Sequence, residues 1–186
     1  MRLGVIGGTF DPIHFGHLRA AETAREALGL DRMLFVTAHV PPHRRAESSA
    51  LDRFAMTCLA TANHPAFVAS DLELQRPGPS YTVETLRALR ALEPAARLVL
   101  VVGSDTLPEM ATWHEAGALR ELAEIAVVAR PGEAPSALPA GVHRVAGPAL
   151  AVAATEIRTL AAAGASLRYL VPDPVADYIV KRGLYR

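Results

Sequence analysis

The chain has 186 residues, of which 51% are hydrophobic and 20% are charged, and its 19 basic and 19 acidic residues leave no formal net charge. This length and composition favour one globular domain over residues 1–186, and they argue against a disordered chain and against a general binder of nucleic acids or membranes. One cysteine excludes an internal disulfide and a cysteine zinc cluster.

The first residues show no secretory signal, because the chain enters an apolar segment directly. No apolar run reaches about 18 residues, the length that a membrane-spanning helix requires. We therefore expect a cytoplasmic protein.

A glycine-rich turn follows the first predicted strand, residues 3–6. Residues 7–17 read Gly-Gly-Thr-Phe-Asp-Pro-Ile-His-Phe-Gly-His, and a helix is predicted over 18–28, closed by Gly29. Glycines let the backbone approach a ligand, and the N–H groups of the turn and of the helix N-terminus attract negative charge. The turn matches neither a Walker A loop nor a dinucleotide-binding fingerprint, so we interpret it as a phosphate site of another kind.

Two histidines, His14 and His17, distinguish this turn. If the helix begins near residues 15–16, their spacing brings both imidazoles to one side of the turn, above the phosphate site. A lone histidine at a helix start is usually a surface or capping residue. The joint pattern Gly-x-Phe-Asp-Pro-x-His-x-Gly-His directly after the first strand is much rarer, and it favours a functional site.

A second short, apolar strand is predicted over residues 33–37. The loop that follows, residues 38–45, contains two prolines that forbid both helix and sheet pairing. Its two histidines and two arginines make it the most positive local segment of the chain. Such a loop is often simply solvated, but on the same sheet edge as the first turn it becomes a second wall for a phosphate.

An amphipathic helix is predicted over residues 51–62. Its apolar residues follow helical spacing and are expected to form the inward face: Leu51, Phe54, Ala55, Cys58, Leu59 and Ala62. Further on, a short strand over 67–69, a loop over 75–81 and a helix over 82–92 continue the alternation.

The clearest buried strand, residues 97–102, ends on Gly103-Ser104-Asp105. Ligands of open α/β sheets bind outside the carboxyl ends of strands, where an acidic residue often takes a ribose hydroxyl. Asp105 equally suits the N-cap of the short helix that follows, and the two roles are compatible. The only tryptophan, Trp113, lies between helical pieces, where core packing is the alternative to ligand contact.

Another buried strand is predicted over residues 125–129, followed by a loop over 131–141. A helix then opens near Thr155, a plausible N-cap. Arg158 lies one turn into it, where a cation does not suit the helix dipole, and this favours a bound anion nearby. A final amphipathic helix closes the chain, so a helical part begins at about residue 155. The alternation throughout predicts an α/β fold, a Rossmann-like doubly wound parallel sheet with helices on both faces.

Taken together, these stretches resemble the bacterial nicotinate-nucleotide adenylyltransferases, of the nucleotidyltransferase superfamily with the His-x-Gly-His motif. The resemblance runs nearly end to end and rests on the segments 7–17, 40–44, 79–82, 103–105, 112–113 and 130–132. The first motif alone names only the superfamily. The Val-Pro-Pro-His-Arg, Pro-Ser-Tyr-Thr and Thr-Trp segments point to the nicotinate enzymes.

One segment departs from the family pattern. The family's late motif is usually Ile-Ser-Ser-Thr-x-Ile-Arg, whereas residues 152–158 read Val-Ala-Ala-Thr-Glu-Ile-Arg. Ala153 and Ala154 thus replace two hydroxyls that would contact phosphate. We expect the site to survive with weaker phosphate contacts, because Thr155, Arg158 and the backbone amides remain.

The resemblance implies transfer of the adenylyl group of ATP to nicotinate mononucleotide, giving deamido-NAD and pyrophosphate in NAD biosynthesis. Mg²⁺ is implied as a cofactor carried mainly by ATP, without a protein ligand that can be named. The nucleophile is a phosphate oxygen that needs no general base. ATP and nicotinate mononucleotide are the expected partners, with no nucleic acid and no membrane.

The resemblance also assigns roles to residues. His14, His17 and Arg158 are the expected catalytic residues, the histidines on the ATP phosphates and the arginine on their β/γ end. The expected substrate-binding residues are Gly8, Thr9, Phe10, Asp11, His43, Tyr81, Thr82, Gly103, Asp105, Trp113, His114, Arg130 and Thr155. Of these, Asp105 is assigned to the adenosine ribose, and His43, Thr82 and Trp113 to the mononucleotide.

Two alternatives stay open from the sequence. A sister adenylyltransferase acting on nicotinamide mononucleotide or pantetheine phosphate keeps the first motif but lacks Pro-Ser-Tyr-Thr and Thr-Trp. A catalytically weak nucleotide-binding module is allowed by the two alanines at 153 and 154. Pyrophosphate release with ATP and each candidate mononucleotide separates all three.

The late motif yields a first prediction. Ala154→Ser is expected to change kcat/KM for ATP by less than about tenfold, roughly 1.4 kcal/mol, because backbone amides and Arg158 carry the phosphate contacts. Arg158→Ala should reduce it far more, since no other charged donor can replace the guanidinium there. Steady-state kinetics with varied ATP measure both, and a nearly silent Arg158→Ala would remove the late motif from the site.

Overall fold

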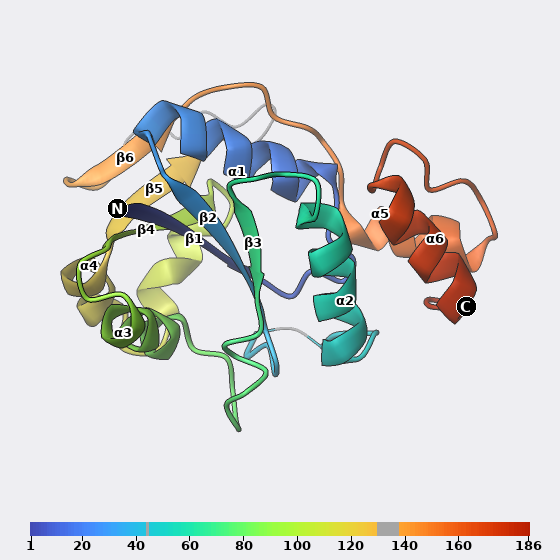
Figure 1. The fold of residues 1–186 in the computed structure, drawn as a ribbon, viewed down its shortest axis with the longest axis horizontal. Helices are drawn as coiled ribbons and strands as arrows, with labels where there is room; N and C mark the ends of the chain where they lie inside the picture. Colours follow the sequence, from blue (N-terminus) through green and yellow to red (C-terminus); the bar gives the residue numbers. More distant parts are fainter. Residues whose placement is uncertain (44, 130–137) are drawn as a thin grey trace.

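The computed structural model of the chain describes residues 1–43, 45–129 and 138–186. Within them, six strands form one parallel sheet in the order β3-β2-β1-β4-β5-β6 (Figure 1). The strands are β1 (Arg2–Gly8), β2 (Arg32–Thr37), β3 (Phe67–Ser70), β4 (Arg97–Gly103), β5 (Glu124–Val128) and β6 (Val142–Val145). The predicted α/β fold with a Rossmann-like parallel sheet is confirmed.

Helices cover both faces of the sheet (Figure 1). They are α1 (Phe15–Leu28), α2 (Ala50–Thr61), α3 (Thr82–Leu92), α4 (Leu119–Leu122), α5 (Ala154–Ala162) and α6 (Asp173–Arg182), with two 3₁₀ turns, η1 (Leu107–Thr112) and η2 (Ala116–Ala118). Buried residues of α1, α2, α5 and α6 share one hydrophobic cluster, whereas those of α3 and α4 belong to a second. Successive residues of β4 alternate between the two clusters, as expected for a strand covered on both faces.

The strand order reverses beside β1, and this places the candidate site. From β1 the chain winds outward through β2 and β3 on one side and through β4, β5 and β6 on the other. Ligands of such sheets bind at this switch point, outside the carboxyl ends of the strands. The turn between β1 and α1, residues 9–14, lies there.

Helix α1 begins three residues earlier than the predicted range of 18–28, at Phe15, and ends as predicted with Gly29 in the left-handed region at φ 60°. Strand β6 was not predicted. It has only four residues, and its two inner residues, His143 and Arg144, are polar and exposed, as suits the edge of a sheet. Short edge strands of this kind carry little apolar signal.

The predicted inward face of the helix over 51–62 is largely wrong, and of its six residues only Leu59 packs against a described hydrophobic cluster. Leu51 is 73% exposed, and the buried residues of α2 are mostly polar: Asp52, Arg53, Met56, Thr57 and Thr61. These polar side chains are accepted inside because each has hydrogen-bond partners there. Apolar spacing alone therefore predicted the wrong face of α2 as the buried one.

The predicted N-cap at Thr155 is also wrong. Helix α5 begins at Ala154, and its N-cap is Ala153, whose backbone is extended at φ −116° and ψ 135°. Because alanine has no side-chain oxygen, no side chain caps the first N–H groups of α5. Helix α6 packs beside α2, and α5 lies at the same end of the molecule, remote from β6 (Figure 1).

No helix within the described parts of the chain has the length and apolar character needed to cross a membrane.

Candidate active site

The turn between β1 and α1 has a strained backbone, and its residues are tightly packed against one another. Phe10 adopts φ 50°, in the left-handed region that non-glycine residues rarely occupy. Its buried ring lies against Gly8, where a Cβ atom would approach the ring to 2.7 Å, so only glycine fits at that position. Strain of this kind persists only when the surroundings fix it, and it concentrates at functional sites.

The two histidines of the turn lie together, as predicted. The rings of His14 and His17 are stacked, with centroids 3.7 Å apart and an interplanar angle of 23°. The N–H of His14 donates to Nδ1 of His17 over 3.3 Å. Since Nδ1 accepts this bond, neutral His17 carries its proton on Nε2. His17 can therefore donate a hydrogen bond from Nε2.

Arg158 reaches the same turn from α5, which follows it by more than 140 residues in the chain. Its Nη1 donates to the Asp11 carbonyl over 2.9 Å, and its Nε donates to Glu47 Oε1 over 2.6 Å. Nη2 lies 3.4 Å from the Thr155 hydroxyl, which accepts its bond. The predicted proximity of Arg158 and Thr155 to the first motif is thus observed.

Asp11 supports the turn with a buried carboxylate, which is 6% exposed. Its Oδ2 accepts a bond of 2.6 Å from the Glu47 N–H. Its Oδ1 accepts bonds from the Ser48 hydroxyl and, over 2.7 Å, from the Tyr185 hydroxyl. The Asp11 carboxylate is therefore committed to joining the turn to two distant segments of the chain.

Arg53, which the sequence analysis missed, lies beneath the turn and is 1% exposed. Its guanidinium donates to four backbone carbonyls, those of Thr9, Ala38, His39 and Ser48. Burial lowers the pKa of this guanidinium, an effect that the nearby Asp11 carboxylate opposes. An arginine among the inward positions of α2 was the available signal, but the predicted helix face left it outside.

The loop after β2 is joined to the segment before α3. The N–H of His39 donates to the Ser80 hydroxyl over 2.8 Å, and the N–H of Ser80 donates to the Val40 carbonyl over 2.9 Å. His43 is exposed on this loop, and Arg44 lies outside the described residues. The two loops that the sequence assigned to the mononucleotide therefore form one wall.

A buried carboxyl group, Glu73, lies at this junction and is 6% exposed. The Thr85 hydroxyl donates to it. Burial raises the pKa of Glu73, against the opposing effects of hydrogen bonds from Thr85 and Ser80 and of the Arg76 charge.

Aromatic side chains continue the wall. Tyr81 is the N-cap residue of α3, and its ring stacks on the ring of His114, with centroids 4.3 Å apart. Half-buried Trp113 precedes His114 and packs against the same hydrophobic cluster as Tyr81. Thr82 opens α3, so the N–H groups of that helix start face the same region.

The loop that carries Trp113 and His114 is fixed by Arg87 of α3. Both terminal nitrogens of Arg87 donate to the Glu115 carboxylate, over 3.1 and 2.6 Å. Glu115 adopts φ 49°, a second strained residue. This ion pair holds the bend that presents Trp113 and His114.

An apolar cavity lies between the carboxyl ends of β1, β4 and β5 and the start of α1. Its lining includes Ile6, Gly16, Ala20, Val102, Gly103 and Leu150. Its apolar lining suits a flat aromatic ring more than a phosphate. Gly103, predicted as a substrate contact, is part of that lining.

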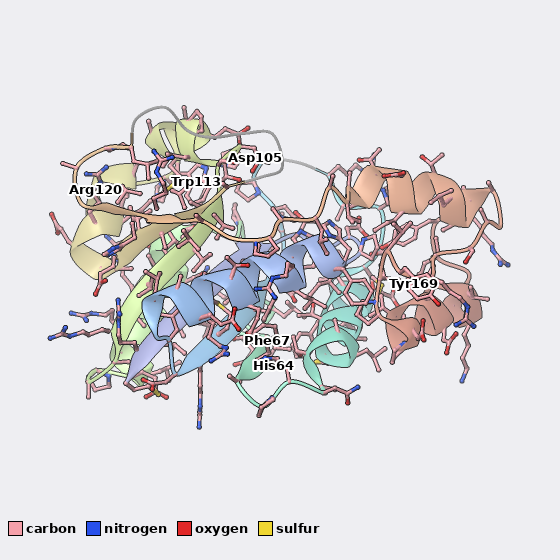
Figure 2. The ribbon with its side chains drawn as sticks, turned by 90° about the horizontal axis from the view of Figure 1, so that it is seen from above. His64, Phe67, Asp105, Trp113, Arg120 and Tyr169 are labelled. Atoms are coloured by element: carbon pink, nitrogen blue, oxygen red, sulfur yellow. The ribbon has the colours of Figure 1, made fainter. Side chains whose placement is uncertain are left out.

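Asp105 is exposed on the segment between β4 and β5 that also carries Trp113 (Figure 2). The N-cap of η1 is Thr106, so the alternative role of Asp105 as that N-cap is wrong. Its assignment to a ribose stays a prediction. The predicted contact Arg130 and the rest of the Arg-Pro-Gly segment lie outside the described residues.

Among the described residues, no group of three or more His, Cys, Asp or Glu side chains could hold a metal ion. The donors gathered around the first turn are N–H groups, imidazoles and guanidiniums. This arrangement is suited to binding anions.

Comparison with known proteins supports this reading of the geometry. The model of the cytidylyltransferase-like family matches residues 5–160. A probable nicotinate-nucleotide adenylyltransferase of Thermus thermophilus is 48% identical over 186 residues, which is 100% of both chains. One of Symbiobacterium thermophilum is 45% identical over 197 residues, with 99% of this chain and 95% of that protein covered.

Solved structures agree on the fold. A Plasmodium falciparum nicotinic acid mononucleotide adenylyltransferase complexed with NaAD matches with a TM-score of 0.82 at 17% identity, covering 99% of this chain and 97% of that one. The same enzyme complexed with APC gives a TM-score of 0.79 at 16% identity, covering 99% and 96%.

The buried carboxyl of Glu73 yields a prediction on stability. Because its pKa is raised on folding, folding favours the protonated form. That stabilisation is complete below the unfolded-state pKa of about 4.3, and it is lost as the pH rises through the folded-state pKa. Relative to the E73Q variant, the native protein should therefore lose free energy of unfolding as the pH rises from the acid range.

Urea titrations of both proteins in matched buffers measure this difference, from which groups common to the two proteins cancel. A difference that stays flat, or that rises with pH, contradicts the assignment.

Proposed function

The chain belongs to the nicotinate-nucleotide adenylyltransferases, within the cytidylyltransferase-like family, and on that premise we propose how its residues bind the substrates and carry out the reaction. The protein transfers the adenylyl group of ATP to nicotinate mononucleotide, in NAD biosynthesis. A phosphate oxygen of the mononucleotide attacks the α-phosphorus of ATP, and the bond to the β-phosphate oxygen breaks. The products are deamido-NAD and pyrophosphate.

This reaction needs charge stabilisation more than proton transfer. A phosphate monoester with a second pKa of about 6 is largely deprotonated at neutral pH, so its oxygen attacks without a general base. The protein must instead bring two anions together and stabilise charge on the α-phosphate and on the departing pyrophosphate. Histidine, arginine and backbone donors supply that stabilisation.

The single observation that carries this proposal is the hydrogen bond from the His14 N–H to Nδ1 of His17. It leaves the His17 proton on Nε2, where it serves as a donor to an ATP phosphate. His14, stacked on His17, donates beside it. The N–H groups of Gly8, Thr9 and Phe10 and the N-terminus of α1 complete the anion site.

Arg158 holds the β- and γ-phosphates. In the structure its guanidinium pairs with the half-exposed Glu47 carboxylate, and in the complex the phosphates take the place of that carboxylate. The first N–H groups of α5, which no side chain caps, lie next to Thr155 and donate to the same end of ATP. These groups compensate for the hydroxyls that Ala153 and Ala154 lack.

The adenine ring occupies the apolar cavity at the ends of β1, β4 and β5, and Asp105 on the neighbouring segment accepts from the ribose hydroxyls. The mononucleotide lies against the wall of Tyr81, Trp113 and His114, with His43 on its phosphate side. N–H groups at the start of α3, near Thr82, and at residues 113–114 donate to the nicotinate carboxylate.

Mg²⁺ carried by ATP would neutralise charge on the triphosphate. The Asp11 carboxylate, which belongs to the turn itself, is engaged with protein donors, and this fits a metal held mainly by ATP oxygens. We also propose that the protein acts in the cytoplasm.

Substrate choice is tested with the two mononucleotides. Nicotinamide would bring an NH₂ donor against backbone N–H groups and leave polar groups poorly paired, which strongly reduces specificity constants. We expect kcat/KM for nicotinate mononucleotide to exceed that for nicotinamide mononucleotide at least about a hundredfold, roughly 2.7 kcal/mol. Pyrophosphate release measured side by side decides it, with pantetheine phosphate as a third candidate.

Trp113→Ala is the matched control for this pocket. It should weaken both mononucleotides through lost stacking and leave much of their ratio unchanged. A ratio near one for the native protein would contradict the assignment of the pocket.

The role of His17 is tested by two substitutions. His17→Ala removes one preorganised donor and should lower kcat about a hundred- to a thousandfold with the fold intact. His17→Asn retains an N–H donor and should keep more activity than His17→Ala. Equal and complete loss in both variants, at unchanged circular dichroism, would indicate proton transfer by His17 and overturn the mechanism.

A further inference from the structure

The segment after α6 returns to the active-site turn. Gly183 ends α6 at φ 63°, and the N–H of Leu184 donates to the Ile179 carbonyl over 3.0 Å. This turn directs Leu184 and Tyr185 onto the hydrophobic cluster that contains Phe10 and Ile13. Segment 183–185 is therefore packed against the underside of the first motif.

Tyr185 is held in an unfavourable backbone conformation there. Its φ of 66° lies in the left-handed region, which an aromatic residue adopts only when its contacts compensate. Its half-buried ring packs in the cluster, and its hydroxyl donates to Asp11 Oδ1 over 2.7 Å. The strain is thus offset at a contact with the active-site turn.

The partner of this hydroxyl controls the geometry of the turn. Asp11 lies next to strained Phe10, and its carbonyl accepts the bond from Arg158. Its carboxylate is buried, so each oxygen needs its donors. Of the two hydroxyls that donate to Oδ1, one belongs to Ser48 and the other to Tyr185.

We propose that Tyr185 is a positioning residue for adenylyl transfer: through its hydrogen bond to Asp11 it holds the phosphate-binding turn in the conformation that receives ATP. This proposal rests on the function proposed above. Loss of the hydroxyl leaves a buried carboxylate oxygen short of one donor, and the turn shifts to recover it. Shifted turn amides fit the ATP phosphates poorly, while the mononucleotide wall stays in place.

The chain offers a matched control in Tyr178 on α6. Its hydroxyl donates to Asp52 Oδ1 over 2.9 Å, again from a tyrosine to a largely buried carboxylate. Asp52 lies at the start of α2 and is not part of the turn. Tyr178→Phe therefore removes a similar hydrogen bond between the same end of the chain and a segment outside the phosphate site.

The experiment compares Tyr185→Phe with Tyr178→Phe in the full chain. Tyr185→Phe should lower kcat/KM for ATP roughly tenfold or more and change KM for nicotinate mononucleotide by less than about twofold. Both variants should lower Tm by similar amounts. Tyr178→Phe, however, should leave kcat/KM for ATP within about twofold of the native value. A merely structural role for Tyr185 would not produce this split between the substrates.

A double-mutant cycle supplies the second measurement. Ser48→Ala removes the other hydroxyl from Asp11 Oδ1, so the losses in kcat/KM for ATP should be non-additive with those of Tyr185→Phe. Equal effects of Tyr185→Phe and Tyr178→Phe, additive losses in the cycle, or native kinetics of folded Tyr185→Phe would each overturn the proposal. A native protein without adenylyl transfer would instead overturn the proposed function.

Discussion

Arg53 places a positive charge behind the turn between β1 and α1, where solvent does not reach it. Its guanidinium donates to backbone carbonyls of the turn, of the segment after β2 and of the segment before α2. Because a peptide group is planar and trans, fixing the Thr9 carbonyl on the Arg53 side directs the Phe10 N–H to the opposite side. One buried side chain thus orients the turn and joins it to the loop of the second wall.

The rest of the site is built on the same plan, in which charged side chains fix strained backbone. Arg53 and Arg158 hold carbonyls on either side of Phe10, and Arg87 holds Glu115 in the loop of the aromatic wall. In the proposed complex the substrates therefore meet N–H groups and ring faces that are already in place. Such preorganised donors suit a reaction in which charge moves between phosphates and no proton must be taken from the nucleophile.

The sequence allowed the fold and the position of the site to be predicted, because strand periodicity and the motif of residues 7–17 depend on local spacing. The supporting contacts could not be predicted. Arg53 and Tyr185 act through hydrogen bonds to residues far away in the chain, and hydropathy treats a buried polar residue as a surface one. For the same reason, the buried face predicted for α2 was largely wrong. The edge strand β6 was missed because it is short and half polar.

If Arg158 binds phosphate as proposed, its ion pair with Glu47 disfavours the binding of small anions. Any anion that reaches this guanidinium must first displace an internal carboxylate, and that penalty is the same for every anion. The compensating gain grows with the number of oxygens that the site can engage at once. A free inorganic phosphate engages few of them, whereas the ATP triphosphate in the proposed complex also contacts His17 and the turn. On the proposed function, Glu47 therefore competes with small anions for Arg158 and favours the larger polyanion.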